Sequence, residues 1–127
     1  AGLALLKLIS WDDNPERPSK DAPDLFLIIR HYLDAGNLDR LFEEELDLIE
    51  EGSFDYDLAS ARLLGRDVRN ISNPTTKTKL IEILKRENNS KHGHKIAIDI
   101  LQSDVSQSES YERVLEYFNA LLEGMVE

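Results

Sequence analysis

The stretch DYDLASARLLGRDVRNISNP, residues 55–74, decides the fold class, because it holds one whole helix and the start of the next. Asp55 is a suitable N-cap for a helix over residues 56–71. Apolar side chains follow it at the spacing of one helix face. They are Leu58, Ala61, Leu64, Val68 and Ile71. Asn73 and Pro74 then supply the cap and the first residue of a second helix, so the stretch predicts two successive helices.

Gly65 lies beside the apolar face of the first of these helices. A glycine has no side chain to hold a neighbour away, so backbones can approach closely at such a position. We therefore expect another helix to cross this one near Gly65.

The chain before residue 55 has the same helical character. The helices predicted there span residues 4–11, 20–35 and 38–51. The first is apolar on nearly every side, which is typical of a buried helix. Pro15 and Pro18 force a loop after it, Ser19 is a candidate cap for the second helix, and Gly36 and Gly52 stop the second and third.

The chain after residue 74 continues with helices. The helix that begins there is expected to end near residue 87. KIAIDIL, residues 95–101, alternates like a strand but also fits a helix, and no other strand is present to pair with it. Ser106 and Glu109 form a capping-box pattern before a last amphipathic helix. We therefore predict a single all-α domain over residues 1–127, a compact bundle of about six or seven helices.

Composition excludes several classes of protein. The 127 residues carry a net charge of −10 and no cysteine, so disulfides and thiolate metal sites are excluded. A field of that sign repels nucleic acid, so no direct nucleic-acid binding is expected. No apolar run is long enough to span a bilayer and no cationic leader is visible, which favours a cytoplasmic protein without membrane contact. The start at Ala1, without methionine, indicates a fragment of a longer protein.

Lys7 stands in an unusual place on the first helix. Apolar residues cover most of that helix, so Lys7, flanked by Leu3 and Trp11, is expected to be half buried. Its side chain can extend to water along its apolar stem. Alternatively, it is a cation held ready for an anion.

Asp21 is the corresponding anomaly on the second helix. When the apolar face of that helix is extended toward its N-terminus, Asp21 falls at the centre of the face and Asp24 falls at the edge of the face. A carboxylate there is costly unless it is paired or lies at a cleft, although the first turn of a helix also favours an anion. Lys7, Arg17, Lys20 and Arg66 are candidate partners of Asp21. Such a cluster suits either a bound polyphosphate or a structural ion-pair network.

A third group of charges follows the helix over residues 56–71. Arg62, Arg66 and Arg69 are spaced i, i+4, i+7 and form one basic edge. This edge is either a solvated helix surface paired with neighbouring acids or a strip that contacts phosphate or an acceptor.

Two tempting motifs are rejected. GSFDYD, residues 52–57, resembles a nucleotidyltransferase metal motif, but its two acids follow the Gly-Ser pair too closely and start a helix. HGH, residues 92–94, lies in a polar loop without a third ligand. We therefore expect no metal site and no catalytic residue in this chain.

Three segments together resemble a known bacterial family. They are LALLKLISW (3–11), SKDAPDLFLIIRHY (19–32) with the preceding Arg17, and FDYDLASARLLGRDV (54–68). They are similar to predicted nucleotidyltransferases related to the AbiEii-like toxins of type IV toxin–antitoxin systems. In that family a mixed α/β catalytic core that holds Mg²⁺ precedes such a helical part, and neither its Gly-Ser turn nor its paired acids occur here.

The resemblance implies a set of nucleotide-binding residues. Lys7 matches a lysine that helps to bind the nucleoside triphosphate, and Arg17 matches an arginine a few residues later. Lys20, Asp21 and Asp24 resemble an RD-x-x-D-L motif, with lysine in place of arginine. Mg²⁺ and a nucleoside triphosphate are then expected for the full-length protein, and an antitoxin is an implied partner.

Two functions remain open at this point. The first is the helical C-terminal part of a Mg²⁺-dependent nucleotidyltransferase, inactive alone, whose nucleotide lies against a missing N-terminal domain. The second is a non-catalytic acidic interaction domain that binds a basic partner or forms a homodimer, because the last amphipathic helix can serve either as core or as a dimer seam.

Overall fold

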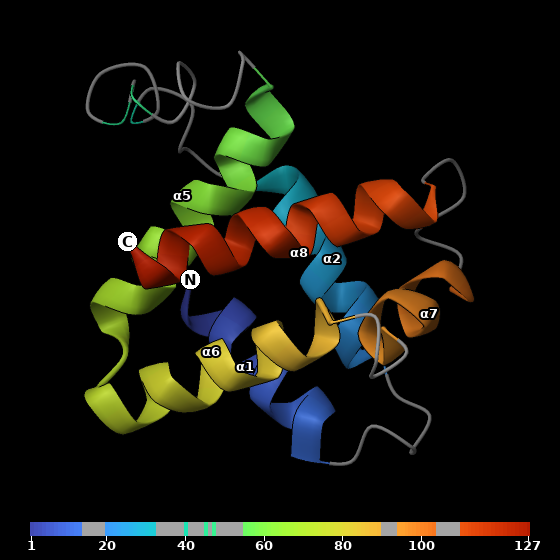
Figure 1. Cartoon of the computed structure of the whole chain (residues 1–127), viewed down its shortest axis with the longest axis horizontal. Coiled ribbons are helices and arrows are strands. Elements are labelled where there is room, and N and C mark those ends of the chain that lie inside the picture. The colour runs from blue at the N-terminus through green and yellow to red at the C-terminus, as the bar shows by residue number, and fades with distance from the viewer. Residues whose placement is uncertain are drawn as a thin grey trace.

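The computed structural model describes residues 1–13, 20–32, 40, 45, 47, 55–89, 94–103 and 110–127. Within these residues the chain forms six helices and no strand, which confirms the all-α prediction (Figure 1). The helices are α1 (Gly2–Asp13), α2 (Asp21–His31), α5 (Tyr56–Ile71), α6 (Pro74–Glu87), α7 (Lys95–Leu101) and α8 (Tyr111–Val126). Of the helices described, none is both long and apolar enough to cross a membrane.

Capping side chains fix the ends of α5 and α6 as the sequence predicts. Asp55 accepts a hydrogen bond from the backbone N–H of Leu58 at 3.1 Å. Asn73 accepts one from the N–H of Thr76 at 2.8 Å, and Pro74 is the first residue of α6. Each cap satisfies a backbone donor that the first turn of a helix leaves free. The helical reading of residues 95–101 is also confirmed, because α7 covers them.

Some predicted elements lie outside the described residues. These include the helix over residues 38–51, apart from three positions in it, and the cap Ser19. The capping-box pair Ser106 and Glu109 lies outside them too. Helix α8 begins at Tyr111 instead, where the Ser110 hydroxyl accepts from the N–H of Arg113 at 3.1 Å.

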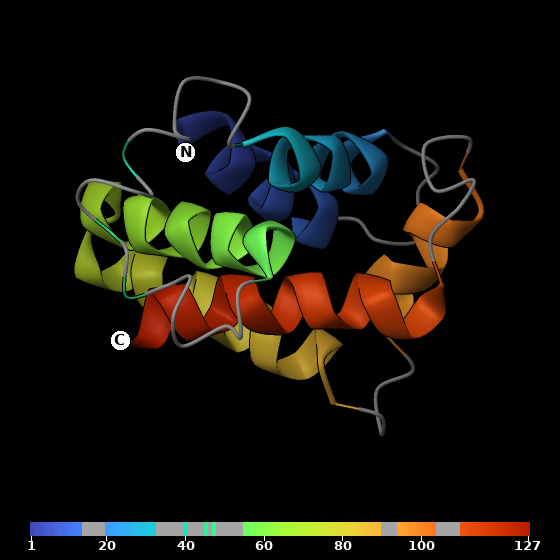
Figure 2. The same ribbon diagram turned by 90° about the horizontal axis from the view of Figure 1, so that it is seen from above.

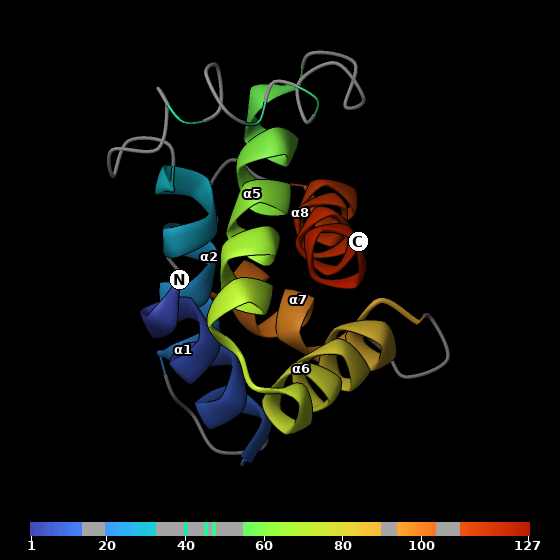
Figure 3. The same cartoon turned by 90° about the vertical axis from the view of Figure 1, so that its left-hand side faces the viewer.

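Helix α5 lies at the middle of the bundle. Figure 3 shows α1 and α2 on one side of it and α8 on the other, while α6 and α7 close one end. Helices α5 and α8 run side by side in the same direction (Figure 2). Contacts at both ends accompany this direction: Asp55 pairs with Arg113 at the start of the two helices, and Arg69 donates to the backbone oxygen of Glu127 at their ends.

Two glycines allow α5 and α8 to touch backbone to backbone. A Cβ atom on Gly65 would overlap the carbonyl oxygen of Leu121 and lie 3.1 Å from the Cα of Gly124. A Cβ atom on Gly124 would in turn overlap the carbonyl oxygen of Arg62. The close crossing expected at Gly65 is therefore confirmed, and Gly124 is a second contributor that sequence reasoning missed.

One apolar core joins all six helices. Its largest fully buried side chains are Phe26, Phe118, Leu25, Ile29, Leu63, Leu64, Leu80, Leu84 and Ile96. The prediction that the first helix is buried on nearly all sides is wrong, because Leu3 and Leu6 are 58% and 61% exposed. Ile71, expected on the inner face of α5, is also exposed. The apolar surface of α1 and of α5 includes these residues, but the neighbouring helices that the structure describes cover only part of that surface.

Candidate functional site

Lys7, Asp21 and Asp24 come together between α1 and α2, as their positions on the helices predict. The two helices are antiparallel neighbours, so the middle of α1 faces the first turn of α2. The Nζ of Lys7 lies 2.8 Å from Asp24 Oδ2 and 3.6 Å from Asp21 Oδ1. Ser10 Oγ also donates to Asp21 Oδ2 at 2.8 Å.

This cluster is an ion-pair network around Lys7. The hydrogen bond to Asp24 is the main reason why the pKa of Lys7 is raised, so Lys7 stays charged. The Lys7 side chain is 25% exposed, and the two carboxylates outnumber its single cation. An incoming phosphate would meet these two carboxylates beside the ammonium group of Lys7.

The structure shows contacts with Lys7 for only two of the other predicted members of this site, Asp21 and Asp24. Lys20 is exposed at the position that precedes α2, and Arg17 lies outside the described residues. Arg66, considered as a partner of Asp21, binds Glu127 and Asp47 instead. The described part of the nucleotide site is therefore reduced to Lys7 and its two acids.

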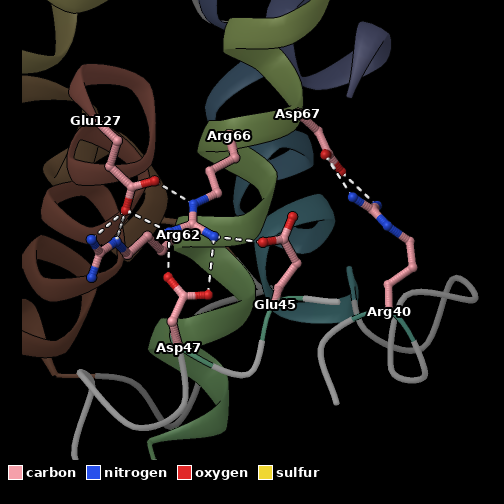
Figure 4. Close-up of polar contacts among 7 residues, drawn as sticks. All are labelled: Arg40, Glu45, Asp47, Arg62, Arg66, Asp67 and Glu127. Carbon is pink, nitrogen blue, oxygen red and sulfur yellow. Dashed lines mark hydrogen bonds and ion pairs between the residues drawn. The ribbon is translucent and has the colours of Figure 1, made fainter. Parts of the chain in front are cut away.

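Arg62 and Arg66 of α5 meet carboxylates from other parts of the chain (Figure 4), and Arg69 donates to the backbone oxygen of Glu127. Arg62 and Arg66 both bind the carboxylate of Glu127. Arg66 also binds Glu45 at 2.6 Å and Asp47 at 2.7 Å. Of the two alternatives for this edge, pairing with neighbouring acids describes the observed contacts.

Arg66 is the centre of this second network. Its side chain is only 15% exposed and touches three carboxylates. The bonds to Glu127 and Asp47 raise the pKa of Arg66, and the bond from Arg66 lowers the pKa of Asp47. Arg62, Arg66 and Arg69 together balance the charges of Glu45, Asp47 and Glu127.

Sequence reasoning missed a third network around Asp67. Tyr32, the residue that follows α2, donates to Asp67, and Arg40 binds the same carboxylate with two hydrogen bonds of 2.8 and 2.9 Å. Burial raises the pKa of Asp67, but the bonds from Arg40 and Tyr32 outweigh it and leave the pKa lowered. Burial and the bond to Asp67 raise the pKa of Tyr32 to about 12.

Glu87 is a buried acid that the sequence did not single out. It is 4% exposed, and its Oε1 accepts from the backbone N–H of Ile96 at 2.8 Å. Its Oε2 accepts from Arg86 Nε at 3.0 Å, and Arg86 in turn binds Asp12 on α1 at 2.5 Å. Glu87 therefore caps α7 from the end of α6, which is a structural role that only the folded chain reveals.

The rejected metal motifs gain no support. Asp55 caps α5 and binds Arg113, whose hydrogen bond is the main reason why the pKa of Asp55 is lowered. The Nδ1 of His94 lies 2.6 Å from the backbone oxygen of Glu87, and His92 lies outside the described residues. In the part of the chain that the structure describes, no group of three His, Asp or Glu side chains is placed to hold a metal ion.

A broad pocket of about 740 Å³ lies along the outer face of α6, beside the end of α1. Its charged lining residues are Asp12, Lys79, Glu82 and Arg86, and their charges cancel. The pocket therefore offers no preference for an anion or a cation, and none of the predicted site residues lines it.

No protein-family model, curated protein or solved structure matches this chain. The resemblance to the AbiEii-like nucleotidyltransferases therefore depends only on the three sequence segments that carry it. It remains a hypothesis about this chain.

Proposed function

We propose that this chain is a protein–protein interaction domain that binds a cationic amphipathic segment of another protein. The observation that carries the proposal is an apolar ridge on α1. Leu3 and Leu6 are more than half exposed, and they share one helix face with Ser10 and Asp13, which are exposed as well. Exposed leucines one turn apart are typical of surfaces that receive an amphipathic helix.

The charges beside this α1 ridge favour a cationic partner. Asp13 and Asp24 are 66% and 39% exposed; Asp13 lies 3.7 Å from Lys79, and the cation of Lys7 is already engaged by Asp24 and Asp21. Two copies of the chain would bring acidic surfaces together, and each copy carries a net charge of −10. A basic partner therefore complements the surface better than a second copy does.

Ion pairs within the fold engage five of the arginines that could otherwise face a partner. Arg40, Arg62, Arg66, Arg86 and Arg113 each bind a carboxylate. The outer face of α8 meanwhile exposes Glu112, Glu116 and Glu123. Each ion pair cancels one positive and one negative charge, so acids outside these pairs carry the net charge of −10 that a partner meets.

Titration with a designed peptide tests this function. The probe is a helical peptide with leucines at i, i+3 and i+7 and lysines on both flanks, and the control peptide carries glutamate in place of lysine. We expect the lysine peptide to bind, and the double substitution Leu3→Gln with Leu6→Gln to weaken binding at least tenfold, as measured by fluorescence anisotropy.

Ile71→Gln is the matched control, because Ile71 is 56% exposed but lies on α5. It should leave the affinity unchanged. Equal binding by the doubly substituted variant and the parent would rule out the α1 ridge as the docking surface. Sedimentation at several concentrations without peptide tests the second copy, and concentration-dependent dimers that Leu6→Gln dissolves would replace the basic partner with a homodimer.

A nucleotidyltransferase role is the second candidate, favoured by the meeting of Lys7, Asp21 and Asp24. Here the domain would complete a nucleotide cleft in a longer protein. Calorimetric titration of the full-length protein with Mg²⁺ and nucleoside triphosphates should show binding that Lys7→Ala or Asp21→Ala weakens. If both variants keep their fold, affinity and turnover, the two residues do not contact the nucleotide.

A further inference from the structure

Three arginines of α5 converge on a single residue, Glu127, which follows the end of α8. Arg62 and Arg66 hold the Glu127 carboxylate from two sides, and Arg69 Nη1 donates to the Glu127 backbone oxygen at 2.9 Å. Figure 4 shows the side chains of Arg62 and Arg66 directed at this carboxylate. The spacing i, i+4, i+7 places the three guanidinium groups along one edge of a rigid helix.

Such an arrangement has the chemistry of an oxyanion site. Planar guanidinium groups present paired N–H donors that match the oxygens of a carboxylate or a phosphate. Arg62 and Arg66 use these donors on both oxygens of Glu127. The Glu127 carboxylate thus occupies the position that an external oxyanion would take.

We propose that Arg62, Arg66 and Arg69 form an oxyanion-binding strip that Glu127 occupies from within the chain, and that a phosphate or carboxylate group of a ligand competes with Glu127 for it. The strip shares no residue with the α1 ridge. The inference therefore stands whether or not the proposed interaction with a cationic partner is correct.

The remaining charges set the strength of this competition. Glu45 and Asp47 stay on Arg66 when Glu127 leaves, so the three arginines then carry an excess of one positive charge. Glu127 competes as an intramolecular group with an effective concentration of about 1 mM or more. An external anion must exceed that value, so the parent chain binds phosphate weakly and a chain without the Glu127 charge binds it more strongly.

Substitution Glu127→Gln tests the competition directly. The probe is inorganic phosphate, and the readout is the NMR signal of the arginine Nε–H groups together with calorimetry. We expect Glu127→Gln to bind phosphate at least tenfold more tightly than the parent does. Acetate in a parallel titration separates the two sources of oxyanion, since a stronger response to phosphate assigns the strip to phosphate groups and a stronger response to acetate assigns it to carboxylates.

Glu123→Gln is the matched control. Glu123 lies one turn earlier on α8, is exposed, and accepts from Asn119 at 3.1 Å rather than from the arginines. Glu123→Gln removes the same charge as Glu127→Gln but leaves the carboxylate that the arginines hold in place. We therefore expect it to leave phosphate binding unchanged. Adding Arg62→Gln or Arg69→Gln to Glu127→Gln should abolish the gain.

Two outcomes would overturn the proposal. One is a Glu127→Gln chain that is folded by circular dichroism but binds phosphate no better than the parent does. The other is an equal gain in the Glu123→Gln chain, which would assign the effect to net charge. Should Glu127→Gln fail to fold, the parent is titrated to high phosphate, where the Nε–H signals of Arg62 and Arg66 must shift before those of Arg113 if the proposal is correct.

Discussion

At the scale of single residues, Asp67 shows how one carboxylate joins separate parts of the chain. Asp67 lies on α5, and its carboxylate accepts hydrogen bonds from Tyr32, the residue that follows α2, and from Arg40. Its side chain is 15% exposed, so water weakens these bonds only in part. Through this network the stability of the fold depends on pH in acid, where Asp67 titrates, and in alkali, where Tyr32 titrates.

The sign of each effect follows from the direction of the pKa shift. The pKa of Asp67 is lowered below its usual 3.8, so its contribution to stability is present above that pH and is lost as the pH falls through it. The pKa of Tyr32 is raised from 10.0 to about 12, so its contribution is present below pH 10.0 and is lost as the pH rises toward 12.

Substitution Asp67→Asn should therefore flatten the acid side of the stability profile. At neutral pH the variant should lose about 1–2 kcal/mol of unfolding free energy, because Arg40 and Tyr32 lose a charged acceptor. As the pH falls below 4 the parent should lose more stability than the variant, since asparagine does not titrate. Urea unfolding at a series of pH values measures both quantities, and parallel pH profiles would contradict the assignment.

The residue pairs that the sequence could predict are the local ones. Lys7 and Asp21 were expected to meet because each stood against the apolar pattern of its own helix, and the two helices are neighbours in sequence. The partners of Arg66 were not predictable, because Glu45, Asp47 and Glu127 come from distant segments. Periodicity within one helix carries no information about which remote acid will reach a given arginine.

At the scale of helices, the contact between α5 and α8 depends on the absence of two side chains. Gly65 and Gly124 each face backbone atoms of the opposite helix. Backbone cannot rotate aside as a flexible side chain can, so an added methyl group must separate the helices. A change at either glycine therefore alters packing along the whole helix pair.

Substitution Gly65→Ala should destabilise the protein by about 1–3 kcal/mol, the usual cost of overpacking, despite the better helix propensity of alanine, worth about 1 kcal/mol. Chemical denaturation measures the loss. Gly2→Ala is the control, because nothing lies within 4 Å of a Cβ added there, and it should be neutral or slightly stabilising. A Gly65→Ala chain as stable as the Gly2→Ala chain would show that the helices separate at no cost.

The sequence predicts where a helix begins when a capping side chain marks that position. It does not predict how much of the apolar surface of each helix is buried. The bounds of α5 and α6 follow from Asp55, Asn73 and Pro74, whose capping roles are local. The exposure of Leu3 and Ile71 could not be read from periodicity, because an apolar pattern shows which side of a helix avoids water but not how far its neighbours extend.

At the scale of the whole molecule, one core connects the first helix to the later ones. Trp11 on α1 is 3% exposed, and its Nε1 donates to Asp99 on α7 at 2.8 Å. Phe26 on α2 meets Tyr117 on α8 edge to face, with ring centroids 5.5 Å apart. Neither end of the described chain has a core of its own, so the six helices should unfold together.

Trp11 is the only tryptophan in the sequence, which makes it a reporter of this cooperativity. We expect its fluorescence and the far-UV circular dichroism of all helices to show the same midpoint in urea, because α1 cannot leave without opening the common core. A fluorescence transition that precedes the loss of helix would show instead that α1 and α7 separate while α5 and α8 remain folded.

The shared direction of α5 and α8 also determines the order in which the protein can fold. Two helices that run the same way need a long connection, and here α6 and α7 lie within it. Gly65 and Gly124 are about 60 residues apart in the chain, so their contact closes a large loop at an entropic cost that nearby contacts avoid. We therefore expect the hairpin of α1 and α2 to form early in folding and the central pair of α5 and α8 to form late.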